Sequence, residues 1–149
     1  MECRDRRIAV LSYCFIYSAN TRIATRTRGG VSDHRLRRIE PLIRELAKSG
    51  HDVIVTCHWG YEYSLYPLPY QMRIARRMIA AGATLVLGHG PHFPQGIEHY
   101  QGSTIVYSMG NFIFDEPHKF SNRSFVFGVE IDASGRPRNQ EIFPVHLRR

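Results

Sequence analysis

The sequence has few cysteines and none of the patterns that mark a membrane-spanning or low-complexity protein. Its three cysteines, Cys3, Cys14 and Cys57, have no paired spacing, which excludes a disulfide framework and a zinc ribbon. No apolar run approaches the roughly 20 residues that a membrane-spanning helix needs. No solenoid-type repeat occurs either. The 149 residues, 43% of them hydrophobic, therefore indicate one globular domain with a sizeable core.

Acidic side chains are scarce relative to basic ones. Twenty Lys and Arg face thirteen Asp and Glu, which gives a formal charge of +7, and arginine supplies most of it. An anionic partner such as phosphate, nucleic acid or a polyanion is one interpretation. Solvated helix faces are the favoured one, because the basic clusters alternate with apolar positions. No basic motif interleaved with aromatic residues occurs, so we expect no nucleic-acid partner.

One structural unit occurs twice in the middle of the chain. In each copy a segment with helical spacing ends at a glycine, Gly50 or Gly82, and an apolar strand-like run follows, over 53–56 or 84–87. A turn that contains histidine comes next. If the two strands are parallel neighbours, both turns leave the carboxyl edge of one sheet, where open α/β sheets place their ligands.

The segments before the second unit complete an α/β pattern. Residues 8–17 are rich in β-formers, and we favour an internal strand there over a weak signal peptide, because no clear cleavage site follows. Helical spacing over 36–46 predicts a helix that Pro41 either kinks or begins. A second helix is expected to begin near Pro69.

Beyond the second unit the pattern changes to that of a β-meander. A hairpin is expected around 101–103, and the alternating run over 124–131 is expected to pair with a last strand over 142–147. The predicted fold class is therefore α/β with an α+β tail, in which parallel strands are followed by a β-meander. Such a sheet is mixed or packs against a second sheet.

Three histidines in the two turns are the candidate metal ligands. His58 lies in the first turn, and His89 and His92 lie in the second, which glycine and Pro91 constrain. Imidazoles that converge at one sheet edge suit zinc, manganese or iron. The alternative is a hydrogen-bonded structural His58 and a turn with two exposed histidines.

This candidate site has few carboxylates that could serve as metal ligands. Glu62, four residues after His58, is a candidate to orient that ligand or to act as an acid or base. Manganese, iron and two-metal sites normally add carboxylates, and none follows a strand. Asp33-His34 precede the first helix, and we expect them on the wrong side of the unit, away from the edge that carries the histidine turns. We expect Asp115 to fix a turn. The other histidines are expected in loops or at the surface: His34, His51, His99, His118 and His146.

Four motifs occur in order between residues 52 and 115. They are Val55-Thr56-Cys57-His58-Trp59-Gly60-Tyr61-Glu62-Tyr63, Tyr66-Pro67-Leu68-Pro69, Gly88-His89-Gly90-Pro91-His92 and Tyr107-Ser108-Met109-Gly110-Asn111-Phe112. Together they resemble the poly-γ-glutamate capsule-biosynthesis (CapA-type) family. The resemblance implies a calcineurin-like metallophosphoesterase fold, a four-layer α/β/β/α sandwich. It also implies a role in the synthesis, transport or anchoring of an anionic polyglutamate capsule.

The resemblance also implies a ligand set. The histidines of the two turns look like metal ligands in such proteins, which carries onto His58, His89 and His92. Glu62 and Asn111 would lie near the site as catalytic candidates. The implied cofactor is a divalent metal (Mn, Zn or Fe), dinuclear in a complete domain, that activates water for hydrolysis.

One departure from the family pattern limits this expectation. The family's amino-terminal half carries a Gly-Asp strand end and an Asn-His turn, and neither occurs in residues 1–50. We therefore expect residues 1–149 to form a single partial domain, the carboxy-terminal half of the sandwich, as a fragment or split gene product. Alone it would bind metal weakly and have little phosphoesterase activity. The alternative is a non-catalytic polyanion-binding or assembly component that keeps only half of the fold.

The same resemblance suggests partners and leaves the compartment open. An anionic polymer or phosphoester is the implied substrate, and a missing amino-terminal half or membrane synthase subunits are implied protein partners. Family members are commonly membrane-associated or extracytoplasmic. This sequence shows no convincing export signal.

Overall fold

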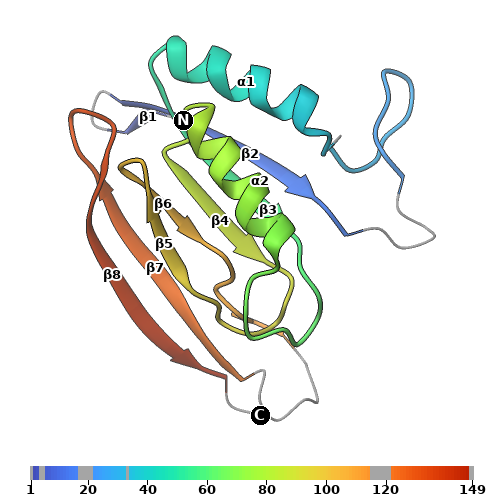
Figure 1. The fold of residues 1–149 in the computed structure, drawn as a ribbon, viewed down its shortest axis with the longest axis vertical. Helices are drawn as coiled ribbons and strands as arrows, with labels where there is room; N and C mark the ends of the chain where they lie inside the picture. Colours follow the sequence, from blue (N-terminus) through green and yellow to red (C-terminus); the bar gives the residue numbers. More distant parts are fainter. Residues whose placement is uncertain (1, 4–5, 17–21, 33, 115–121, 148–149) are drawn as a thin grey trace.

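A six-stranded mixed sheet is the centre of the molecule (Figure 1). The computed structural model describes residues 2–3, 6–16, 22–32, 34–114 and 122–147. The strand order is β1-β2-β3-β4-β6-β5, and a separate two-stranded sheet pairs β7 with β8. The bounds are β1 Glu2–Cys3, β2 Arg6–Cys14, α1 Leu36–Lys48, β3 His51–His58, α2 Pro69–Ala80, β4 Leu85–His89, β5 Ile97–Tyr100, β6 Ser103–Val106, β7 Arg123–Ile131 and β8 Pro137–His146.

The repeated unit predicted from the sequence is confirmed. β2, β3, β4 and β6 run parallel, and β1 and β5 add antiparallel strands at the two edges. Each helix ends at a glycine in the left-handed region, Gly50 with φ 80° and Gly82 with φ 112°. Glycine takes this conformation without the steric cost that a Cβ would bring. The two crossovers therefore return directly into β3 and β4.

Both helices cover the same face of the sheet (Figure 1). On β3 the alternate residues Val53, Val55 and Cys57 are fully buried and belong to one core cluster with Ile39 of α1 and Met78 of α2. Burial raises the pKa of the Cys57 thiol, which keeps it protonated. Cys57 is therefore a small core residue, as predicted.

Helix α1 begins at Leu36 and contains Pro41, so the helix does not start at the proline. Pro41 lies inside the helix, beyond the first turn, so its missing N–H removes one intrahelical hydrogen bond. Helix α2 begins at Pro69, the first-turn position that suits proline's fixed φ. Its predicted start is confirmed. None of the helices in the described ranges is long and apolar enough to cross a membrane.

The β7–β8 hairpin contacts the sheet face away from the helices. Asp52 and Thr104 alternate with helix-facing core residues, so their side chains belong to that opposite face. The Thr104 hydroxyl donates to Oε1 of Gln140 on β8, and the Arg6 Nη1 donates to the Ala133 carbonyl in the hairpin turn, at 3.1 Å. The hairpin predicted over 124–147 is confirmed, with one irregularity between Gly128 and Glu130.

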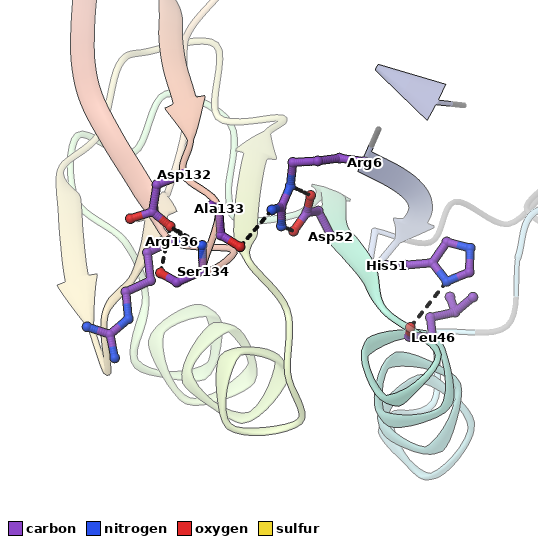
Figure 2. Close-up of polar contacts among 8 residues, drawn as sticks. All are labelled: Arg6, Leu46, His51, Asp52, Asp132, Ala133, Ser134 and Arg136. Carbon is purple, nitrogen blue, oxygen red and sulfur yellow. Dashed lines mark hydrogen bonds and ion pairs between the residues drawn. The ribbon is translucent and has the colours of Figure 1, made fainter. Parts of the chain in front are cut away.

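The turn of this hairpin is fixed at the amino edge of the sheet (Figure 2). Arg6 binds both carboxylate oxygens of Asp52, which is only 4% exposed. Within the turn, Asp132 accepts hydrogen bonds from the Ser134 side chain and from the backbone of Arg136, and these lower the pKa of Asp132. The described elements thus form helices, a mixed sheet and a hairpin. They confirm an α/β fold, and the four-layer sandwich remains a prediction.

Candidate functional site

The carboxyl ends of β3 and β4 bring two of the predicted histidines together. His58 and His89 are register partners at the last paired position of the two parallel strands. Their ring centroids lie 4.9 Å apart at an interplanar angle of 43°. The Trp59 N–H donates to the His89 carbonyl at 2.9 Å, which extends the pairing into the turn. The predicted convergence at one sheet edge is confirmed for these two residues.

His92 lies in the same region with its backbone in the left-handed conformation, φ 65°. Its Nδ1 lies 2.8 Å from Oδ1 of Asn111. An amide oxygen only accepts hydrogen bonds, so Nδ1 is the donor in this contact and carries a proton. The rings of Tyr63 and Phe114 flank the imidazole at 5.8 and 4.9 Å between centroids. Three neighbours thus fix the orientation of His92.

The first histidine turn is anchored by Trp59, the one tryptophan of the chain. Its side chain is fully buried, and its indole Nε1–H donates to the Tyr107 carbonyl at 2.9 Å. Gly88 makes this packing possible, since a Cβ there would overlap the Tyr107 carbonyl oxygen and lie 2.5 Å from Trp59 Nε1. The Gly60 N–H donates to the Tyr70 hydroxyl at 2.8 Å. The turn that carries His58 is therefore held from the core side.

Burial keeps two imidazoles neutral. It lowers the pKa of His58, where the nearby His92 adds to the effect and Glu62 opposes it. Burial also lowers the pKa of His89, and the proximity of His58 adds to the effect, because two neighbouring imidazoles resist carrying positive charge together. A neutral imidazole has a nitrogen lone pair available for a metal or a proton at neutral pH.

The two other predicted residues differ in their contact with the histidines. Asn111 is 7% exposed and bonds His92 directly. Glu62 is exposed and acts on His58 through its charge. Asn111 is thus a positioning residue for His92 in this structure, and a catalytic role for either residue stays a prediction.

The described residues do not by themselves fit a metal ion. Across the described ranges, no three His, Cys, Asp or Glu side chains are grouped closely enough to serve as a ligand set. The imidazoles of His58 and His89 pack on one another, and that of His92 is held by an amide. These rings supply nitrogen donors but no carboxylate. The metal site therefore stays a prediction.

The structure contradicts the predicted place of His34 on the wrong side of the unit. Its ring packs edge-on against Phe15 at 5.6 Å, and the Phe15 N–H donates to the His58 carbonyl at 2.7 Å. A helix that crosses back over a parallel sheet starts beside the end of the preceding strand. His34 therefore lies at the carboxyl edge. Asp33, Asp115 and His118 fall outside the described residues.

Sequence reasoning also missed the aromatic rings around His92. Tyr63 has φ 62° and its N–H donates to the Pro91 carbonyl at 2.8 Å, which ties the two turns together. Phe114 comes from the segment after Asn111. The segment over 61–69 is visibly rich in aromatic residues, but nothing in its spacing shows which ring meets which histidine.

The Asn111 contact gives a direct prediction. In Asn111→Leu we expect His92 to lose its fixed Nδ1–H tautomer, because the acceptor for that proton is gone. Two-dimensional ¹H–¹⁵N spectra of the histidine rings at neutral pH measure this. Asn122→Leu is the matched control, since Asn122 bonds His146 far along the chain. An unchanged His92 tautomer in Asn111→Leu would show that the amide does not orient the ring.

The fold is similar to that of a solved structure. A hypothetical protein from Thermus thermophilus matches 98% of this chain and 60% of its own chain, with a TM-score of 0.61 and 14% sequence identity. That likeness concerns the fold alone. It shows that this α/β arrangement is a known architecture.

The family follows from the sequence matches. Residues 1–116 match the bacterial capsule synthesis protein family PGA_cap, and the chain belongs to this family. The PGA biosynthesis protein CapA of Bacillus subtilis is 37% identical over 72% of this chain and 28% of its own length. The capsule biosynthesis protein CapA of Bacillus anthracis is 45% identical over 43% of this chain and 16% of its own length. The CapA-type resemblance is confirmed.

A mycobacterial relative carries a related name. The probable polyglutamine synthesis accessory protein MT0602 of Mycobacterium tuberculosis is 30% identical over 68% of this chain and 29% of its own length. The chain thus spans less than a third of the length of the curated relatives it matches.

Proposed function

We propose that this chain acts in the biosynthesis of a poly-γ-glutamate capsule as a CapA-type protein. The support is its family membership and the names of its relatives, which are a PGA biosynthesis protein, a capsule biosynthesis protein and a polyglutamine synthesis accessory protein. The proposed partners are an anionic polymer or phosphoester, residues of a longer protein, and membrane synthase subunits. Nucleic acid is not among them.

We also propose that the carboxyl edge contributes imidazoles to a divalent metal site whose carboxylate ligands come from outside the described residues. The observation that carries this is the strand-end pairing of His58 with His89, beside a His92 whose Nδ1 is bound by Asn111. When bound, manganese, zinc or iron would supply a Lewis acid and an activated water for hydrolysis. Two metals in a complete domain would suit the metallophosphoesterase-like four-layer fold.

The chain's own residues have definable tasks in such a site. Trp59 and Tyr107 close the core beneath the first turn and exclude water from that side. Asn111 holds the Nδ1 proton of His92. Glu62 is exposed beside His58 and can exchange a proton at its carboxylate.

A second candidate is a non-catalytic polyanion-binding or assembly component. Two observations favour it. The described residues include no grouped metal ligands, and the formal charge is +7. In this case the carboxyl edge that carries His58, His89 and His92, the histidine edge, would be a structural part of the fold. Binding of an acidic polymer would be the activity.

Metal analysis separates the two candidates. We expect the full chain, dialysed after exposure to Mn²⁺ or Zn²⁺, to retain a small amount of metal that His58→Ala/His92→Ala loses, because the imidazoles are the donors available at this edge. The readout is metal per chain by mass spectrometry. The matched control His99→Ala/His146→Ala removes two histidines elsewhere and should retain as much metal as the wild type.

Equal and negligible metal in the wild type and in His58→Ala/His92→Ala would exclude the metal site for this chain. Hydrolysis of a generic phosphodiester with added Mn²⁺ then tests catalysis. We expect little activity from the chain alone, because the described residues include no group of three side chains that could hold a metal ion.

A further inference from the structure

Two hollows adjoin on the helix-covered side of the molecule. One, of about 500 Å³, lies between the start of α1 and α2 and is lined by Arg35, Arg37 and Arg77, with Phe15 and Ile74 among its apolar residues. The other, of about 470 Å³, lies between α2 and β5 and is lined by Arg73, Arg76 and Arg77, with Met72 and Tyr100 among its other residues. Arg77 lines both hollows, so the cations form one continuous surface. We call it the arginine track.

The track is positive at its surface because its acidic partners lie underneath. Glu40 and Glu98 pair with Arg77 and Arg76, yet the two carboxylates are only 13% and 21% exposed, whereas the arginines are 53% and 43% exposed. Among the described residues, no acidic side chain lines either hollow. An approaching ligand would therefore meet guanidinium groups and not the carboxylates that balance them.

The guanidinium groups also have donors to spare. Arg76 and Arg77 bind their carboxylates through Nε at 2.8 and 2.6 Å, which leaves the two terminal nitrogens of each without a partner in the part of the chain that the structure describes. The side chains of Arg37 and Arg73 form no hydrogen bond or ion pair with any residue in the described ranges. Guanidinium nitrogens bind carboxylates in a planar fork, often through two bonds.

The aromatic rings in the track are half-buried, and each packs against another side chain. The Arg76 guanidinium lies 5.6 Å from the centre of the Tyr100 ring, and Phe15 packs against His34 and Trp59. A single-stranded nucleic acid needs open rings for its bases to stack on. Half-buried rings that already have a neighbour offer less of this surface than open ones, whereas the apolar floor of the track suits the methylene groups of acidic side chains.

We infer that the arginine track docks an extended polycarboxylate, a chain that carries a carboxylate on each repeat unit. The inference rests on the proposed function for the identity of the polymer, a polyglutamate, but the track is separate from the histidine edge and needs no metal. It assigns a function to the basic clusters on the two helices. From the sequence alone, the favoured interpretation of these clusters is that they are solvated helix faces.

Binding of a fluorescein-labelled oligoglutamate to the full chain tests this, with anisotropy measured at low salt and in excess EDTA. We expect Arg37→Gln/Arg73→Gln to weaken binding about fivefold or more, because each change removes a cation that has no other partner among the described residues. The matched control Arg26→Gln/Arg28→Gln removes the same charge from the loop before α1. It should weaken binding much less.

Three results would overturn the inference. They are no binding by the wild type, equal weakening by the two double variants, and single-stranded DNA of equal charge binding as tightly with the same dependence on Arg73. Circular dichroism of each variant confirms that the fold is kept. Because EDTA is present throughout, binding of oligoglutamate in this assay does not depend on a metal. A failure of the proposed metal site would therefore leave this binding unchanged, whereas a failure of the arginine track would abolish it.

Discussion

Replacement of Gly88 by alanine is expected to unfold much of the molecule under mild denaturant. The added Cβ would overlap the Tyr107 carbonyl oxygen and lie 2.5 Å from Trp59 Nε1, and the first of these is backbone that cannot turn away. Either β4 moves away from the segment after β6, or the indole loses its hydrogen bond in a fully buried place. Overpacking and a buried unpaired donor together cost about 3–5 kcal/mol.

Urea unfolding of Gly88→Ala, followed by tryptophan fluorescence, measures this loss. Trp59 is the one tryptophan in the chain, so the signal reports the anchor of the first histidine turn itself. Gly96→Ala is the control, because a Cβ there would meet nothing within 4 Å. A Gly88→Ala protein as stable as Gly96→Ala would mean that the contact between the indole and Tyr107 is not as close as described.

Replacement of Arg6 by methionine is expected to release the β7–β8 hairpin from the sheet. Arg6 joins β2, the buried carboxylate of Asp52 and the hairpin turn through the Ala133 carbonyl (Figure 2). Methionine keeps much of the side-chain length but cannot donate, so Asp52 loses its cation and the turn loses its anchor. Backbone amides of β8 should then exchange with deuterium on the order of tenfold faster.

Native-state hydrogen exchange compares this variant with Arg138→Met. Arg138 pairs with Asp132 within the hairpin itself, and its side chain is 59% exposed, so its loss should leave exchange almost unchanged. Asp52→Asn in the Arg6→Met background should restore part of the protection, because it removes the unpaired charge. Equal exchange in the two single variants would show that the hairpin is held by other contacts.

Local patterns predicted the repeated units well. Apolar runs bounded by Gly50 and Gly82 determine buried parallel strands, and the turns after them share an edge by topology alone. The meeting of His58 with His89 follows from that arrangement. The hairpin of β7 and β8 was equally visible, because its alternation and turn residues are local signals.

Contacts between distant side chains could not be predicted in this way. Arg6 and Ala133 are 127 residues apart in sequence, and nothing near either one identifies the other. The position of His34 beside Phe15 depends on the direction of α1, a topological fact that the sequence reasoning misjudged. The arginine track depends on Arg77 lying between two hollows, and helical spacing alone does not show this.

The left-handed backbone at His92 also has a cost in stability. A non-glycine residue with φ 65° is held in a conformation that glycine would adopt at lower energy. Residues held in this way are found at functional sites more often than elsewhere. The backbone and the imidazole therefore make opposite demands at position 92, because the residue that relaxes the chain there would also remove the ring.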